Sequence, residues 1–138
     1  MSNRKSVGDE VTERKMENWY DVAKRKGDGG MNRMNQVLFQ QYAMEGKEPV
    51  LVAFCASWCG YCRRIQPALK RIAEQNRGKF WVGIMDIDME PELSKQEEIE
   101  VLPTLVLYQQ GKVLGSIVGP DSQAIIEEFV EESLPKGL

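Results

Sequence analysis

Two cysteines three residues apart, Cys59 and Cys62, are the side chains of this sequence best suited to chemistry. A long helical pattern begins at Cys59, so both thiols are expected on one side of its first turn, within reach of a disulfide. The unsatisfied backbone N–H groups and the dipole at a helix start favour an anion, which lowers the pKa of the first cysteine. We therefore predict that Cys59 is a nucleophile and that Cys62 is the resolving thiol.

The chemistry that such a pair supports is thiol–disulfide exchange. The Cys59 thiolate attacks a substrate disulfide, and Cys62 then breaks the mixed disulfide, which releases reduced substrate and leaves an internal Cys59–Cys62 bond. Zinc binding is the other common use of a CxxC pair, but the sequence holds three cysteines and no histidine. A closed four-ligand site could draw only on those cysteines and a carboxylate. We expect catalysis without a metal or a cofactor.

The composition of the chain is that of an ordinary globular protein and excludes several functions. The 138 residues are enough for one domain. They include 18 basic and 21 acidic residues, so the basic excess of a nucleic-acid-binding surface is absent. The lack of histidine excludes Cys–His nucleophile pairs and Ser–His triads. We expect no nucleic-acid partner and, by default, a monomer.

The hydropathy of the sequence bears on its location. The longest apolar stretch, residues 49–56, is far shorter than a membrane span, and the first fifteen residues contain no apolar run typical of a secretory signal. A small, odd number of cysteines agrees with a reducing compartment. We therefore expect a cytoplasmic protein with no membrane partner. An extracytoplasmic location is the alternative if a leader or anchor lies outside this sequence.

The elements around the cysteine pair are expected to alternate between helix and strand. Residues 49–55 are almost continuously apolar, which is typical of a central strand buried on both faces. The helix that begins at Cys59 should run to about Asn76, with a kink at Pro67. The other expected elements are a first helix at about 32–45, a strand at 80–87, a short helix at 91–98, a hairpin of 104–108 with 112–118, and a last helix after residues 119–122.

This order predicts an α/β fold with a central mixed β-sheet and helices on both of its faces. The predicted domain comprises residues 31–138. Residues 1–30 are polar, rich in charge and end in a glycine-rich run, so we expect them to form a mobile N-terminal extension.

Several segments resemble the thioredoxin family, in the family's order and spacing. Residues 50–62 are similar to its central strand running into the WCxxC motif, here Trp58-Cys59-Gly60-Tyr61-Cys62. Pro67 matches the proline that kinks the family's active-site helix, and residues 101–104 resemble its cis-proline loop. Gly119 falls where the family has a glycine that lines the substrate groove. The resemblance covers roughly residues 33 to 134 and implies a thioredoxin fold and protein-disulfide oxidoreductase activity.

The resemblance also implies partners and a substrate platform. Disulfide-containing proteins would be the substrates, and a thioredoxin reductase or another thiol electron donor would reduce the Cys59/Cys62 pair again. A cis peptide bond is implied before Pro103, where backbone groups would pair with an extended peptide. The implied platform consists of Trp58, Gly60, Tyr61, Leu102, Pro103 and Gly119.

Two departures from the family's pattern bear on the mechanism. Ala53 stands where thioredoxins proper have a buried aspartate, and Ile84 stands where a buried lysine often partners it. Losing both charges avoids an unpaired buried ion. That aspartate is generally assigned to proton transfer at the resolving cysteine, so Cys62 must lose its proton to water or to another group.

The second departure is the Gly60-Tyr61 spacer, which replaces the usual Gly-Pro. It leaves three functions open, which are a disulfide reductase, an exported or anchored oxidase or isomerase, and a non-catalytic binding module. We interpret Cys55 as a small core residue, with a regulatory thiol as the alternative. The acids between Asp86 and Glu92 are interpreted as a solvated loop and helix start, with a hard-cation site as the alternative.

Overall fold

A five-stranded mixed sheet forms the centre of the computed structural model, which describes residues 31–135. Its strands are β1 (Met31–Met34), β2 (Val50–Cys55), β3 (Trp81–Asp86), β4 (Thr104–Gln109) and β5 (Lys112–Val118), in the spatial order β1-β3-β2-β4-β5. β1 and β2 both pair in parallel with β3, β4 is antiparallel to β2, and β5 is antiparallel to β4. The α/β prediction with a mixed sheet is confirmed, and the expected N-terminal extension lies outside the described residues.

β2 lies at the centre of the sheet because all six of its residues are apolar and can be buried. None of them is more than 3% exposed. Alternate side chains of a strand point to opposite faces, so Leu51, Ala53 and Cys55 belong to one hydrophobic core, and the other three side chains belong to the second. β2 is therefore held in place by packing on both of its faces, and the cysteine pair follows shortly after its end.

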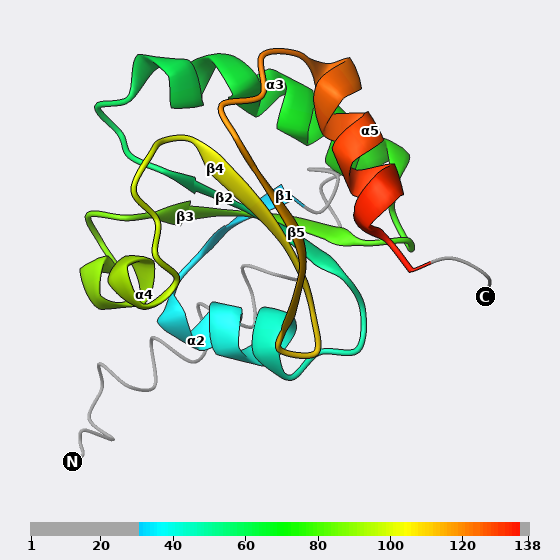
Figure 1. Ribbon diagram of the computed structural model, residues 1–138, viewed down its shortest axis with the longest axis horizontal. Helices are drawn as coiled ribbons and strands as arrows, with labels where there is room; N and C mark the ends of the chain where they lie inside the picture. Colours follow the sequence, from blue (N-terminus) through cyan, green and yellow to red (C-terminus); the bar gives the residue numbers. More distant parts are fainter. Residues whose placement is uncertain (1–30, 136–138) are drawn as a thin grey trace.

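Helices cover both faces of the sheet (Figure 1). α3 (Gly60–Gln75) and α5 (Gln123–Ser133) lie on one face, while α2 (Gln36–Leu38), the π-helical η1 (Phe39–Met44) and α4 (Pro91–Gln96) lie on the other. On the second face the rings of Phe39 and Tyr108 meet edge to face, with their centroids 5.0 Å apart. Within residues 31–135, none of the helices is both long enough and apolar enough to cross a membrane.

The segment before β2 corrects the helix expected over residues 32–45. Met31–Met34 is an edge strand that pairs with Val82–Met85 of β3. The helix begins only at Gln36, after Asn35, whose Oδ1 accepts a hydrogen bond of 2.8 Å from the Leu38 N–H. The spacing of Met31 and Met34 suits a helix, but the free edge of β3 offers these backbone groups hydrogen bonds that the local sequence does not reveal.

Candidate active site

Cys59 caps the start of α3. Its backbone is extended, and its sulfur accepts a hydrogen bond of 3.2 Å from the backbone N–H of Cys62. The turn between β2 and α3 is closed by a hydrogen bond of 3.1 Å from the Cys59 N–H to the carbonyl oxygen of Ala56. The central strand and the helix start thus place the first sulfur where the sequence predicted it.

The two thiols of the pair have opposite shifts of pKa. Burial would raise the pKa of Cys59, but hydrogen bonds from the Cys62 thiol and from the N–H groups of Cys62 and Tyr61, together with the charge of Arg63, lower it overall. The pKa of Cys62, whose side chain is fully buried, is raised by that burial and by its hydrogen bond with Cys59. Cys59 is therefore the thiol of the pair that ionises more readily.

Four residues of the expected platform meet beside the pair. The peptide bond between Leu102 and Pro103 is cis, and the Gly119 N–H donates a hydrogen bond of 2.8 Å to the Pro103 carbonyl oxygen. The Tyr61 hydroxyl donates a hydrogen bond of 2.7 Å to the Gly119 carbonyl oxygen. Gly119 has a φ of 59°, in the left-handed region that favours glycine. The loops before β4 and after β5 are thus joined to the first turn of α3.

The other two platform residues flank the first cysteine. Gly60 is the first residue of α3, and Trp58 is 65% exposed. The indole Nε1 of Trp58 donates a hydrogen bond of 2.8 Å to Asp88, in the loop after β3. Trp58 is therefore an anchored surface residue, as expected of a contact surface.

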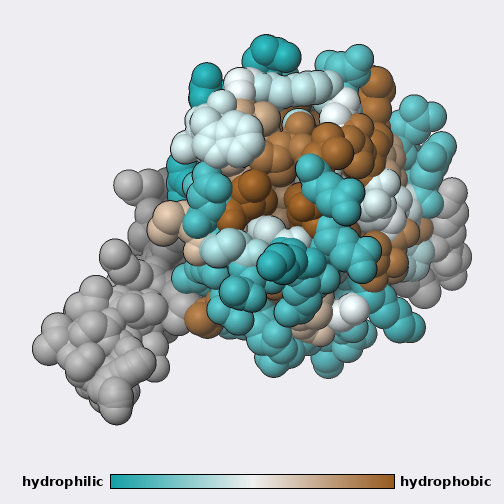
Figure 2. Space-filling model, turned by 60° about the vertical axis from the view of Figure 1, so that its left-hand side comes forward, coloured by the Kyte–Doolittle hydropathy of each residue, from teal (hydrophilic) through white to brown (hydrophobic). Residues whose placement is uncertain are grey.

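The surface around the pair is apolar at its centre. Figure 2 shows the end of the molecule where β2 and β3 end and α3 begins, with hydrophobic residues gathered in the middle and hydrophilic residues around them. Val101 and Val118, the residues directly before Leu102 and Gly119, are 53% and 55% exposed. A surface of this kind can hold an extended peptide that has apolar side chains.

The acidic loop after β3 makes local structural contacts. The Asp86 carboxylate accepts a hydrogen bond of 2.8 Å from the Asp88 N–H, and the Glu90 carboxylate accepts one of 3.0 Å from the Gln36 N–H. In the described part of the chain, no three cysteine, aspartate or glutamate side chains are grouped closely enough to hold a metal ion. These contacts join the Asp86 and Glu90 carboxylates to nearby backbone N–H groups.

Two contacts of the site join residues whose relation the sequence did not indicate. The buried thiol of Cys55 is a hydrogen-bond partner of Cys62, and burial, followed by the effect of Cys62, raises the pKa of Cys55. The Arg63 guanidinium, next to the pair, donates a hydrogen bond of 2.6 Å to the Ser57 carbonyl oxygen. Cys55 is thus a core residue, as expected, and it also contacts the resolving thiol.

Comparison with known proteins places this site in a family. The family model described as Thioredoxin matches residues 31–132. A thioredoxin from Alicyclobacillus acidocaldarius subsp. acidocaldarius is 41% identical over 96 residues, which cover 70% of this chain and 90% of that protein. Thioredoxin 1 from Nostoc sp. is 33% identical over 96 residues, with 70% and 90% coverage. The chain belongs to the thioredoxin family.

Membership of the thioredoxin family confirms the fold and the activity predicted from the sequence. The protein is a thiol–disulfide oxidoreductase with a thioredoxin fold. A bifunctional thioredoxin reductase/thioredoxin from Mycobacterium leprae is also similar, with 33% identity over 92 residues, which cover 67% of this chain. The matched region is 20% of the length of that relative, so the rest of it has no counterpart in the comparison.

Proposed function

We propose that this thioredoxin-family enzyme reduces the disulfides of other proteins, with Cys59 as the nucleophile and Cys62 as the resolving thiol. The observation that carries the proposal is the position of the Cys59 sulfur at the start of α3, where it accepts a hydrogen bond of 3.2 Å from the Cys62 N–H. The lowered pKa of Cys59 and the raised pKa of Cys62 agree with this geometry. A thiolate is the attacking species in disulfide exchange. In the proposed mechanism Cys59 therefore attacks as a thiolate, while Cys62 remains a protonated thiol until the second step.

The proposed reaction has two exchange steps. The Cys59 thiolate attacks one sulfur of the substrate disulfide, a Cys59–substrate bond forms, and the other substrate sulfur leaves as a thiolate that takes up a proton. Cys62 then loses its proton and attacks the Cys59 sulfur, and the second substrate sulfur leaves as a thiolate. Two electrons pass to the substrate, and the enzyme is left with a Cys59–Cys62 disulfide.

We propose that substrates lie across the six platform residues, Trp58, Gly60, Tyr61, Leu102, Pro103 and Gly119. Support comes from the hydrogen bonds that join Tyr61, Pro103 and Gly119 into one surface and from the exposed apolar side chains at its edge. An extended chain can pair its backbone with the loop at Pro103 while its side chains contact the apolar surface. Disulfides in flexible, extended segments are therefore the proposed substrates.

The proposed electron donor is a thioredoxin reductase. This proposal is supported by the family and by the name of the relative from Mycobacterium leprae, which joins a thioredoxin reductase and a thioredoxin in one chain. A donor of this kind maintains reduced thiols, which suits a reducing compartment. The proposal therefore includes the cytoplasmic location expected from the sequence.

Reduction of insulin disulfides tests the direction of the proposed reaction. The protein is incubated with insulin, a thioredoxin reductase and NADPH, and its redox potential is measured by equilibration with glutathione. We expect continuous NADPH oxidation, a pair that is more reducing than glutathione, and no turnover by the matched Cys59→Ser variant. A pair that oxidises reduced peptides and leaves insulin intact would contradict the proposed direction.

A further inference from the structure

The resolving thiol has to lose its proton in a site that is closed to solvent. The side chain of Cys62 is fully buried, and burial raises its pKa. Ala53 of β2 and Ile84 of β3 belong to the same buried core and have no group that accepts a proton. Burial therefore opposes the ionisation of Cys62, and its proton has to pass to water or to another group.

Cys55 contacts Cys62 from the sheet side. It is the last residue of β2, its side chain points into the same core as Cys59 and Cys62, and it is 3% exposed. The groups whose hydrogen bonds shift the pKa of Cys62 are the Cys59 thiol, the backbone at Ala56 and the Cys55 thiol. In the reduced pair the Cys59 sulfur accepts a hydrogen bond from the Cys62 thiol, so it is not a donor to Cys62. Cys55 is therefore the side-chain donor to Cys62 among these groups.

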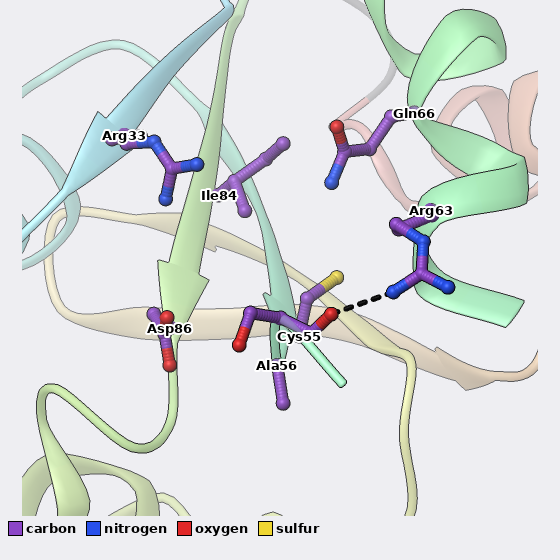
Figure 3. A pocket seen from close by; sticks show the side chains of 8 residues that line it. Arg33, Cys55, Ala56, Arg63, Gln66, Ile84 and Asp86 are labelled. Carbon is purple, nitrogen blue, oxygen red and sulfur yellow. Dashed lines mark hydrogen bonds between the residues drawn. The ribbon is translucent and has the colours of Figure 1, made fainter. Parts of the chain in front are cut away.

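A pocket lies on the other side of Cys55. Its volume is about 200 Å³, and β1, β2, β3 and α3 all contribute to its wall. Figure 3 shows the Cys55 sulfur directed towards the space between Gln66, Ile84 and Arg63. Several polar side chains line the pocket, so it has both the room and the partners that water needs. Cys55 is among the residues that line this pocket, whereas Cys62 is not.

We propose that Cys55 is a positioning residue for the resolving step. Its thiol hydrogen-bonds to the Cys62 sulfur, and the proton that Cys62 loses is passed through Cys55 to the pocket. The inference rests on the proposed function, because it requires a mixed disulfide on Cys59. In that intermediate the Cys62 proton moves to the Cys55 sulfur, while the original Cys55 proton moves to a water molecule. The Cys62 thiolate, now hydrogen-bonded by the Cys55 S–H, attacks the Cys59 sulfur. Cys55 has the same proton count before and after and exchanges no electrons.

The charged groups around the pocket are consistent with a neutral Cys55. Arg33 of β1, Arg63 of α3 and Asp86 of β3 line the pocket, and Asp86 is paired in register with Cys55. Burial first, then Cys62 and Cys59, and last the negative charge of Asp86 raise the pKa of Cys55. Cys55 therefore stays protonated and can serve as a donor, and the Asp86 carboxylate lines the same pocket.

Stopped-flow kinetics can separate the resolving step from the first attack. Each reduced variant is mixed with an aromatic disulfide whose released thiolates absorb visible light. The first thiolate is released by Cys59, at a rate that depends on reagent concentration, and the second by Cys62, at a rate that does not. In Cys55→Val we expect the second release near pH 7 to be about tenfold slower, the size of one hydrogen bond to a charged group, and its pH midpoint to move upward.

The matched variants distinguish the hydrogen bond from packing. Cys55→Ser keeps a donor, so its second release should stay within about threefold of the wild-type rate, a smaller loss than removing the donor. Val52→Ala truncates β2 on its other face and should lower stability without moving the pH midpoint. Cys55→Ala is a second apolar variant if valine is not accommodated. The first release should be unchanged in all of them.

Two results would overturn the inference. One is an unchanged second release, at every pH, in the apolar variants of Cys55. The other is an equal loss in Cys55→Ser and Cys55→Val. Failure of the proposed function would look different, because insulin would then stay intact in the NADPH-coupled assay even if the wild-type protein released both aromatic thiolates. The kinetic comparison of the Cys55 variants and the insulin assay therefore give separate answers.

Discussion

The hydroxyl of Tyr61 donates a hydrogen bond of 2.7 Å to the carbonyl oxygen of Gly119, which lies 58 residues later in the chain. The bond ties the spacer between the two cysteines to the loop after β5. The N–H of Gly119 is bonded in turn to the Pro103 carbonyl oxygen. The tyrosine therefore fixes the platform in a way that is not available to the proline usual at this place in the family, which has no hydroxyl group.

Replacing Tyr61 by phenylalanine should weaken substrate binding more than it slows the chemical steps. Tyr61→Phe keeps the ring but leaves the Gly119 carbonyl oxygen without this donor, at a cost of about 1 kcal/mol in the free energy of unfolding. The looser platform should raise KM for insulin by about threefold to tenfold, the equivalent of one neutral hydrogen bond, with little change in kcat. Steady-state kinetics and urea unfolding measure the two effects.

Tyr108→Phe provides the matched control for this prediction. The hydroxyl of Tyr108 donates a hydrogen bond of 2.8 Å to Glu97, on the opposite face of the sheet from the cysteine pair. Its loss should lower stability and leave KM unchanged. Equal changes of KM in the two variants would show that the contact of Tyr61 with Gly119 has no special part in binding.

Removing the charge of Arg63 should move the ionisation of Cys59 to higher pH. A positive charge favours the thiolate over the thiol, so Arg63 helps to lower the pKa of Cys59, and Arg63→Gln should raise it. The pH midpoint for alkylation by iodoacetamide should lie below that of free cysteine in the wild-type protein. It should rise only slightly in the variant, since solvent screens an exposed charge.

Arg64 provides the control for the loss of a positive charge that is not directed at Cys59. The guanidinium of Arg64 lies over the Tyr61 ring, 5.1 Å from its centroid, and is not among the main groups that shift the pKa of Cys59. Arg64→Gln should leave the alkylation midpoint in place. If Arg63→Gln leaves the pH midpoint of alkylation unchanged or lowers it, Arg63 does not lower the pKa of Cys59 and the prediction is wrong.

Gly46 follows the helical segment before β2 at a position where a side chain does not fit. A Cβ at this position would lie 2.6 Å from the carbonyl oxygen of Tyr42, a backbone atom that cannot move independently of its helix. Gly46→Ala should therefore lower the free energy of unfolding by about 1–3 kcal/mol, the usual cost of forced overpacking. Gly60→Ala is the comparison, since its Cβ would meet only the Arg63 side chain, at 3.8 Å. Equal urea midpoints for the two variants would contradict this.

The sequence was most informative where packing follows a local period. The apolar run of residues 49–55 predicted β2, because a strand buried on both faces needs apolar residues throughout. The helical pattern after Cys59 predicted α3, because its apolar residues recur with the period of a helix that is buried on one face. β1 could not be predicted in the same way. Its four residues, Met31–Met34, have no strand alternation, and they become a strand only through pairing with β3.

The same distinction holds within the site. The cysteine pair, Pro103 and Gly119 lie in local motifs that resemble a known family, so the sequence could indicate each of them. The contact of Cys55 with Cys62 and the bond of Trp58 to Asp88 join separate elements, and they depend on how β2, β3 and α3 pack. No local pattern carries that information.

Trapping the mixed disulfide tests the division of roles within the pair most directly. Cys62→Ser is incubated with insulin, free thiols are alkylated, and the products are identified by mass spectrometry, with Cys59→Ser treated in parallel. Without the resolving thiol the first exchange product cannot be released, so insulin should remain attached at Cys59 in Cys62→Ser and should be absent from Cys59→Ser. Insulin attached at Cys62 in Cys59→Ser, or no adduct at Cys59 in Cys62→Ser, would contradict this account.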